Sequence, residues 1–325
     1  MELTVTHTLN IRFINLEARQ TGTIVRDGFT VQVTAYVAEG NTFGSIVCSG
    51  TTDISTERAA LSSGPGGSTE PATTRSLPLV IMKDRDPQMA GPEVTAALDR
   101  LEDVLESVGR LVRWRFDVAG EEAVLGPMEL RLETEDGSID LYPVPGANFG
   151  DDQCTIGEGG LAEITELSRQ GDEEPLAHQL LREAWDLKYS NPRSSIVIGV
   201  SAAEVGLKRL IVDIAPVTRW LMEELPSPPL VQMMTHYLPE LEIRAPVPRQ
   251  NRCPKGLRKS LQAAVEARNR VVHRGERPGL SLYATLRSVK EFLYLLDYYR
   301  GHEWAAAYLS EETLRELRRS MSDPT

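Results

Sequence analysis

The sequence predicts a strand-rich α+β N-terminal domain, residues 1–170, followed by an all-α helical bundle, residues 171–325. Apolar and polar residues alternate along 2–14 and 29–38, as they do in strands with one buried face. From Pro175 onward, apolar residues recur at helical spacing. Charge divides at the same place. Residues 172–325 hold 22 Lys+Arg and 20 Asp+Glu, whereas the remaining 13 basic and 27 acidic residues give the first part a net charge of −14.

Composition favours a cytoplasmic globular protein. The chain of 325 residues is long enough for two domains that each bury a core. No apolar run is long enough to span a membrane, and the N-terminal stretch MELTVTHTLNIRF lacks the features of a secretory signal. Three scattered cysteines fit reduced thiols better than disulfides or a zinc cluster. We therefore expect no membrane segment, no metal and no cofactor.

The N-terminal domain is expected to consist mainly of strands. Asp27-Gly28 marks a turn, 43–48 is a further strand candidate, and the Ser-, Thr-, Gly- and Pro-rich residues 49–76 predict a long loop. Beyond this loop the pattern predicts strands and two helices. They are the strand Leu77–Met82, the helix Pro92–Val108, the strands Leu111–Val118, Met128–Thr134 and Ile139–Tyr142, and the helix Leu161–Arg169.

The second domain is expected to be an up-and-down bundle with one insertion. A helix from about Pro175 ends at Ser190-Asn191-Pro192, and the next helix, Arg193–Ile214, carries Glu204 within its apolar stripe. Shorter helices are expected in the proline-rich region that follows. The remaining predicted segments are Val217–Leu225, Leu230–Leu238, the irregular Ala245–Pro254, and the helices Lys255–Arg274, Ser281–Tyr299 and Glu303–Arg319.

The helix Lys255–Arg274 carries the most informative residue of the chain. Leu257, Leu261, Ala264, Val265 and Val272 recur at helical spacing and predict its buried stripe. Arg268 falls on that stripe, and Gly275 suits a C-terminal cap. A buried arginine needs a carboxylate partner, an interface or a bound anion, because an unpaired buried charge costs several kcal/mol.

Glu204 and Arg268 are two charges in apolar stripes of neighbouring helices, so we expect them to pair. The pair could be a purely structural salt bridge that fixes helix register. Together with His273, it could also cleave RNA without metal, the histidine moving a proton while the arginine stabilises a phosphate. Residues five apart on a helix are rotated by roughly 140°. A joint site therefore requires the helix to unwind near His273 or a second copy of the chain.

The run Arg268-Asn269-Arg270-Val271-Val272-His273 resembles the motif of HEPN domains, an arginine followed after four to six residues by a histidine. The resemblance covers about Glu174–Arg319. Many HEPN domains are metal-independent ribonucleases of toxins and antiviral systems, with active sites formed where two domains meet. The resemblance implies that Arg268 binds the scissile phosphate, His273 transfers a proton, Asn269 orients one of them, and Glu204 anchors Arg268 or lies beside the site.

Basic residues cluster around the same helix. Within Arg244–Arg277 ten residues are basic and only Glu266 and Glu276 are acidic, which predicts phosphate contacts or, equally, a solubilising surface. Few aromatic residues are interleaved with them, which argues against base stacking. The expected RNA-binding residues are Arg270, Arg274, Lys255, Arg258 and Lys259.

Three functions remain open. The first is a homodimeric HEPN ribonuclease whose N-terminal domain senses a trigger, binds a partner or restrains the nuclease. The second is a catalytically silent HEPN module that acts as an RNA-binding or oligomerisation adaptor. The third is a small-molecule or nucleotide sensor in which the bundle is a dimer scaffold.

Overall fold

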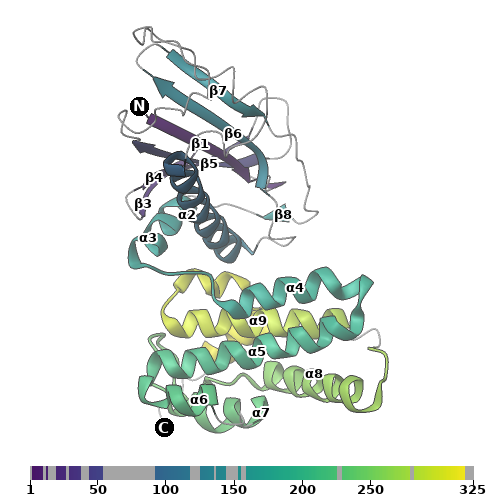
Figure 1. Cartoon of the computed structure of the whole chain (residues 1–325). Coiled ribbons are helices and arrows are strands. Elements are labelled where there is room, and N and C mark those ends of the chain that lie inside the picture. The colour runs from purple at the N-terminus through teal and green to yellow at the C-terminus, as the bar shows by residue number, and fades with distance from the viewer. Residues whose placement is uncertain are drawn as a thin grey trace, which may run out of the picture. The chain divides into compact units, whose positions relative to one another are not determined.

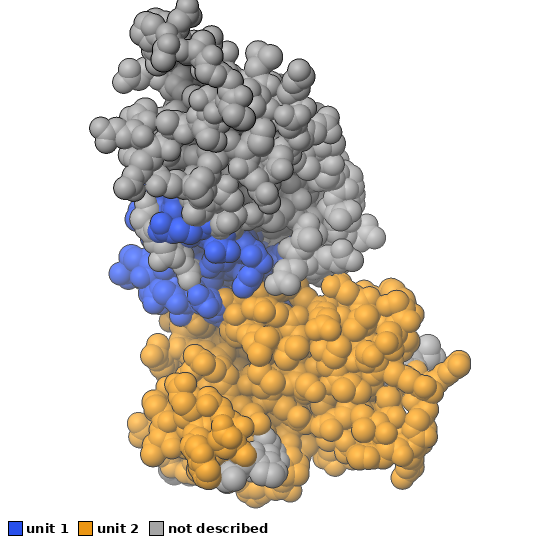
Figure 2. Space-filling model, viewed as in Figure 1, with its two compact units in different colours: residues 1–173 blue, residues 174–325 orange. Residues whose placement is uncertain are grey.

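The computed structural model divides into two compact units, Met1–Glu173 and Glu174–Thr325, which Figure 2 colours separately. This division lies close to the predicted boundary between residues 170 and 171. The structure describes residues 2–9, 12–13, 20–26, 29–37, 44–53, 92–117, 125–134, 137–143, 153–154, 159–224, 229–278 and 282–318. The predicted strand Leu77–Met82 and most of the predicted loop 49–76 lie outside the described residues.

The first unit contains a six-stranded sheet in the order β3-β4-β5-β1-β6-β7, and all its neighbouring strands are antiparallel. Ile24 is the only buried residue among the described side chains of β3, which explains why the sequence pattern does not predict this strand. A short parallel pair, β2 and β8, lies outside the main sheet. The strands are β1 (Glu2–Leu9), β2 (Arg12–Phe13), β3 (Gln20–Arg26), β4 (Phe29–Val37), β5 (Gly44–Asp53), β6 (Leu125–Thr134), β7 (Gly137–Pro143) and β8 (Gln153–Cys154).

Helix α2 (Pro92–Phe116) contacts β1, β4 and β5 (Figure 1), and α3 (Gly160–Gln170) contacts β3 and α2. The predicted strand Leu111–Val118 is wrong, because α2 continues to Phe116. Val108, Leu111, Val112, Trp114 and Phe116 are all buried. Burial on several sides of the helix removes the helical period from the sequence, and the apolar run then looks like a strand.

The second unit is helical, as predicted. Helices α4 (Leu176–Ser190), α5 (Pro192–Ile214), α8 (Lys255–Arg274) and α9 (Leu282–Arg300) lie alongside one another (Figure 1). Two glycines let α5 approach α9 closely. A Cβ atom at Gly199 or Gly206 would lie 2.6 Å from a methyl carbon of Leu286 or Leu293, respectively. None of the described helices combines the length and apolar character needed to cross a membrane.

The predicted insertion between α5 and α8 consists of short helical turns. They are η2 (Pro216–Thr218), α6 (Arg219–Glu224), α7 (Leu230–Gln232), the π-helical η3 (Met233–Tyr237), η4 (Leu238–Glu240) and η5 (Arg249–Asn251).

The predicted last helix is divided into two. Leu309 is extended between η6 (Glu303–Tyr308) and α10 (Glu311–Arg318). The Ser310 hydroxyl accepts a hydrogen bond from the Thr313 N–H at 3.2 Å, and this cap begins α10.

Candidate functional site

Helix α8 has the predicted bounds, Lys255–Arg274. At its start, Glu316 of α10 accepts hydrogen bonds from the backbone N–H groups of Lys255, at 2.6 Å, and Gly256, at 3.4 Å. This carboxylate satisfies two N–H groups that lack a partner within the helix and complements the helix dipole. At its end, Gly275 has the left-handed φ of 66° and donates to the Val271 carbonyl. A distant carboxylate thus caps the start of α8, and a local glycine signal caps its end.

The buried face of α8 differs from the predicted stripe near its end. Val272 is 53% exposed, so its predicted burial is wrong. Val271 takes its place, because steps of three and four residues from Ala264 lead through Ala267 to Val271. Arg268 therefore lies at the edge of the buried face. The buried residues of α8 are Leu257, Leu261, Ala264, Ala267 and Val271.

Arg268 and Glu204 pair as predicted, joining α8 to α5. Nη2 of Arg268 donates to Oε1 of Glu204 at 2.5 Å, and the two side chains are 26% and 30% exposed. The Nε–H of Arg268 is buried and has no hydrogen-bond partner in the part of the chain that the structure describes. An unsatisfied buried donor costs about 1–3 kcal/mol. The bond to Glu204 holds the guanidinium in place, and an anion could reach only the 26% of the Arg268 side chain that is exposed, not the buried Nε.

Asn269 and His273 are both exposed and lie one helical turn apart on α8. Because α8 continues without interruption to Arg274, it does not unwind at His273. Arg268 and His273 consequently remain rotated by roughly 140° about the helix axis. The arrangement within one chain does not bring the two residues to one face, and the remaining route to a joint site is a second copy.

The five predicted RNA-binding residues form two separate groups. Arg270 and Arg274 lie near the end of α8 and pair with Glu276 at 3.6 Å and 3.8 Å. The other three lie at the opposite end, about 22 Å away between group centres by the rise of the helix. There Lys255 and Lys259 are exposed and Arg258 is half-buried.

Acidic residues of α10 lie beside the second group. Glu316 accepts from the backbone of Lys255 and Gly256, and a Cβ atom at Gly256 would lie 3.0 Å from Oε1 of Glu312. These carboxylates offset the positive charge at the start of α8.

Arg252 belongs to the predicted basic cluster but has a structural role. Its guanidinium donates to the carbonyl oxygens of Val247, Pro239 and Leu241. Burial lowers the pKa of Arg252 from its ordinary value. These bonds fix the loop that precedes α8, so Arg252 does not form part of an exposed basic surface.

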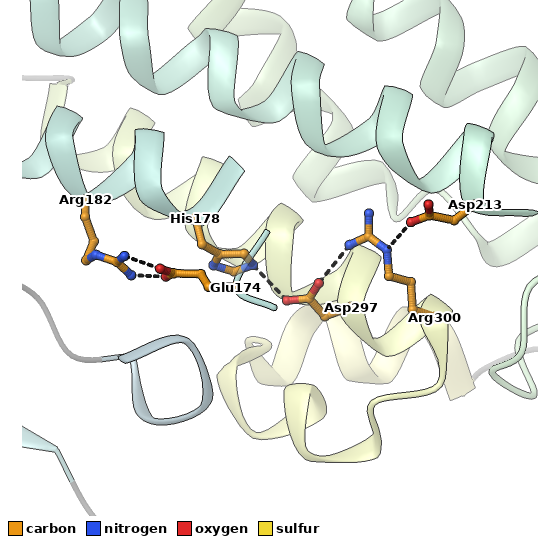
Figure 3. A network of polar contacts seen from close by, with 6 residues as sticks. All are labelled: Glu174, His178, Arg182, Asp213, Asp297 and Arg300. Carbon is orange, nitrogen blue, oxygen red and sulfur yellow. Dashed lines mark hydrogen bonds and ion pairs between the residues drawn. The ribbon is translucent and has the colours of Figure 1, made fainter. Parts of the chain in front are cut away.

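Sequence reasoning misses a polar network inside the bundle (Figure 3). His178 has no partner at ligand spacing in the sequence, yet its Nε2 lies 2.7 Å from Oδ2 of the fully buried Asp297. Arg300 donates to Asp297 at 2.9 Å and to Asp213 at 3.2 Å. The network ties α4, α5 and α9 together. Asp297 interrupts the apolar face of α9, which is the signal that could have revealed it.

A second buried pair belongs to the same region. Arg182 of α4 pairs through two hydrogen bonds with Glu174, whose side chain is fully buried (Figure 3). Within the described ranges, no three His, Cys, Asp or Glu side chains gather in a way that could hold a metal ion.

Comparisons of the chain with family models, with curated proteins and with solved structures find no significant match. Function is therefore inferred from the residues themselves and from the motif in α8.

Proposed function

We propose that the chain is a metal-independent endoribonuclease of the HEPN type that works as a homodimer. The observation that carries this proposal is the half-exposed guanidinium of Arg268, anchored by Glu204, on the same helix as the exposed His273. A guanidinium in a fixed position can bind a phosphate through two hydrogen bonds. An exposed imidazole can transfer a proton near neutral pH.

In the proposed reaction, His273 takes the proton of a ribose 2′-hydroxyl, and the 2′-oxygen attacks the adjacent phosphorus. The bond between phosphorus and the 5′-oxygen of the next nucleotide breaks. The products are a 2′,3′-cyclic phosphate and, after an imidazolium protonates the leaving oxygen, a 5′-hydroxyl. Arg268 stabilises the charge that develops on the phosphate oxygens. Asn269, on the face of α8 that carries His273, orients the imidazole or the RNA.

A second copy of the chain completes the proposed site. Arg268 of one chain and His273 of another can meet in one cleft, whereas the two residues of one α8 point in different directions. Val272 lies between them in the sequence, one helical turn from Arg268, and is 53% exposed. An apolar side chain at this position supports a contact with another copy.

In this proposal the N-terminal unit is the regulatory part of the protein. It senses a trigger, binds a partner or restrains cleavage until RNA destruction is required. The setting is that of the resembled family, a toxin or an antiviral system.

The alternative is a catalytically silent HEPN module that serves as an RNA-binding or oligomerisation adaptor. The charge pairing at α8 favours it. Glu204 neutralises Arg268, and Glu276 lies near both Arg270 and Arg274. With its cations already paired, the helix would bind RNA or a second copy without cutting.

Incubation of the purified chain with end-labelled RNA, with and without EDTA, separates the two functions. The ribonuclease is expected to cut RNA in both conditions and to leave 2′,3′-cyclic phosphate ends. Arg268→Ala and His273→Ala should abolish cutting. Arg219→Ala, at an arginine that is 58% exposed on α6, is the matched control. Equal activity in wild type and both site variants would eliminate the ribonuclease.

Light scattering tests the dimer separately. The wild type should have twice the 36.0 kDa mass of one chain, and Val272→Asp should shift it toward the monomer. A wild-type mass of one chain would contradict the dimeric site.

A further inference from the structure

Four helices meet at the end of the bundle that carries His273. Helix α4 ends there, α5 and α9 begin there, and α8 ends there (Figure 1). Arg193, in the first turn of α5, donates to the carbonyl oxygen of Gly275 at 2.8 Å, which links α5 to the cap of α8. Tyr189 lies only four residues before Arg193, across the turn at Asn191. Residues distant in the sequence are therefore joined near the proposed site.

Aromatic side chains of α4 and α9 gather at this end. Tyr189 is 85% exposed and Tyr283 is 57% exposed. The ring of the half-buried Trp185 lies edge-on to Tyr283 with centroids 5.2 Å apart. Nζ of Lys188 lies 5.1 Å from the Trp185 ring centroid and 5.0 Å from that of Tyr189. We call Trp185, Lys188, Tyr189 and Tyr283 the aromatic cluster.

Besides Lys188, which belongs to the aromatic cluster, further basic residues lie at the same helix ends. Four basic side chains lie in the described residues at this end of the bundle. These residues are the last turns of α4 and α8, the first turns of α5 and α9, and 275–278. They include one acidic side chain, Glu276. The basic residues are Lys188, Arg193, Arg274 and Arg277.

We propose that the aromatic cluster is a stacking site for the bases of single-stranded RNA, with Arg193 and Arg274 binding the flanking phosphates. Every base has a flat face that can stack on an aromatic ring, and a positive surface beside such rings follows the RNA backbone. The occupant is identified by this combination. Two exposed tyrosines with cations at the same helix ends suit a polyanion that carries flat bases better than an apolar protein partner, whose aliphatic side chains offer the cations no anionic group.

The stacking site deepens the proposed function and rests on RNA being its substrate. It would hold the RNA strand at the end of the bundle that carries His273. It also makes the substrate single-stranded, because paired bases are already stacked on one another and cannot lie flat on Tyr189.

Fluorescence anisotropy of the full-length protein with a labelled 2′-O-methyl oligonucleotide tests the stacking site. This probe lacks the 2′-hydroxyl, so cleavage does not interfere. Tyr189→Ala and Tyr283→Ala should each weaken binding by roughly five- to a hundredfold. Tyr189→Phe keeps the ring and should bind like the wild type. Tyr237→Ala is the control, since Tyr237 is 48% exposed but belongs to the insertion.

An abasic oligonucleotide of the same length separates stacking from charge. Its binding should be unchanged in Tyr189→Ala and weakened in Arg193→Gln. Equal binding of the base-bearing probe by the wild type, Tyr189→Ala and Tyr283→Ala would overturn the stacking site, as would failure of the wild type to bind it. A change in dimer mass in Tyr189→Ala, with unchanged RNA binding, would also overturn it and would assign the tyrosine to a protein contact.

The outcome is independent of the cleavage assay. Base-dependent binding in a protein that does not cut RNA would retain the stacking site and eliminate the ribonuclease. RNA cleavage by the wild type, together with unaltered binding in the tyrosine variants, would retain the ribonuclease and eliminate the stacking site.

Discussion

Two groups of charged residues in the helical unit use similar chemistry in different surroundings. The network of His178, Asp297 and Arg300 lies inside the bundle, with Asp297 fully buried. The pair of Arg268 and Glu204 lies at the edge of α8, with about a quarter to a third of each side chain exposed. A buried network loses water entirely and must be satisfied by its own members. A half-exposed pair can exchange a partner for a ligand, so the network is structural and the pair is available for function.

The largest effect is expected from a substitution in the buried network. Asp297→Ala removes the carboxylate shared by His178 and Arg300. Breaking a buried charge pair typically costs about 3–5 kcal/mol, and we expect a loss of that size in the free energy of unfolding measured with urea. Asp213→Ala is the control, because the Asp213 side chain is 33% exposed and only one of the Arg300 contacts is lost. Similar losses in both variants would contradict the distinction.

Arg268→Lys tests the half-exposed pair of Arg268 and Glu204 by the rate of RNA cleavage. Lysine keeps the positive charge but lacks the planar fork that binds a phosphate through two hydrogen bonds. We expect the rate of RNA cleavage to fall about 10²–10³-fold, the usual cost of losing a donor to transition-state charge. The free energy of unfolding should change by about 1 kcal/mol or less. Large losses in both quantities would make Arg268 a structural residue like Asp297.

Glu204→Gln tests whether Glu204 only positions Arg268 or also neutralises its charge. The amide can still accept a hydrogen bond from Arg268 but no longer neutralises it. If Glu204 only positions the guanidinium, cleavage by Glu204→Gln stays within a few fold of the wild type, while Glu204→Ala loses up to about a hundredfold through misplacement. Faster cleavage in Glu204→Gln would show instead that the carboxylate competes with the phosphate for Arg268.

Local signals explain the parts of the fold that the sequence predicts. Pro254 and Gly275 bound α8 at its predicted ends, and the Arg268–Glu204 pair was expected because each charge interrupts an apolar stripe. Asp297 interrupts α9 in the same way, but its partner His178 is 119 residues away and gives no local signal. The strand expected at Leu111–Val118 is part of α2, since burial on several sides hides the helical period.

The aromatic cluster could not be predicted from the sequence. Tyr283 follows Arg274 by only nine residues, but Tyr189 is far from α8 in the sequence, and the meeting of helix ends brings its helix to the same place. For the same reason the sequence argued against base stacking, whereas the fold supplies the rings from α4 and α9.

The smallest expected effect concerns Cys253, just before α8, where burial raises the pKa of the thiol to about 11 from its ordinary 9.0. The folded protein thus holds the thiol proton more tightly than the unfolded chain. This contribution to stability is fully present below about pH 9 and is lost as the pH rises toward 11.

Between pH 8 and pH 10, wild-type stability should fall by roughly 1 kcal/mol more than that of Cys253→Ala in parallel urea titrations. The difference between the two proteins isolates the thiol from Tyr299, whose pKa burial also raises. An identical pH dependence in both proteins would mean that water reaches Cys253. The segment before α8 that Arg252 fixes would then be open to solvent. The start of α8 would be less rigid than we infer from its packing, and α8 would hold the Arg268–Glu204 pair less firmly.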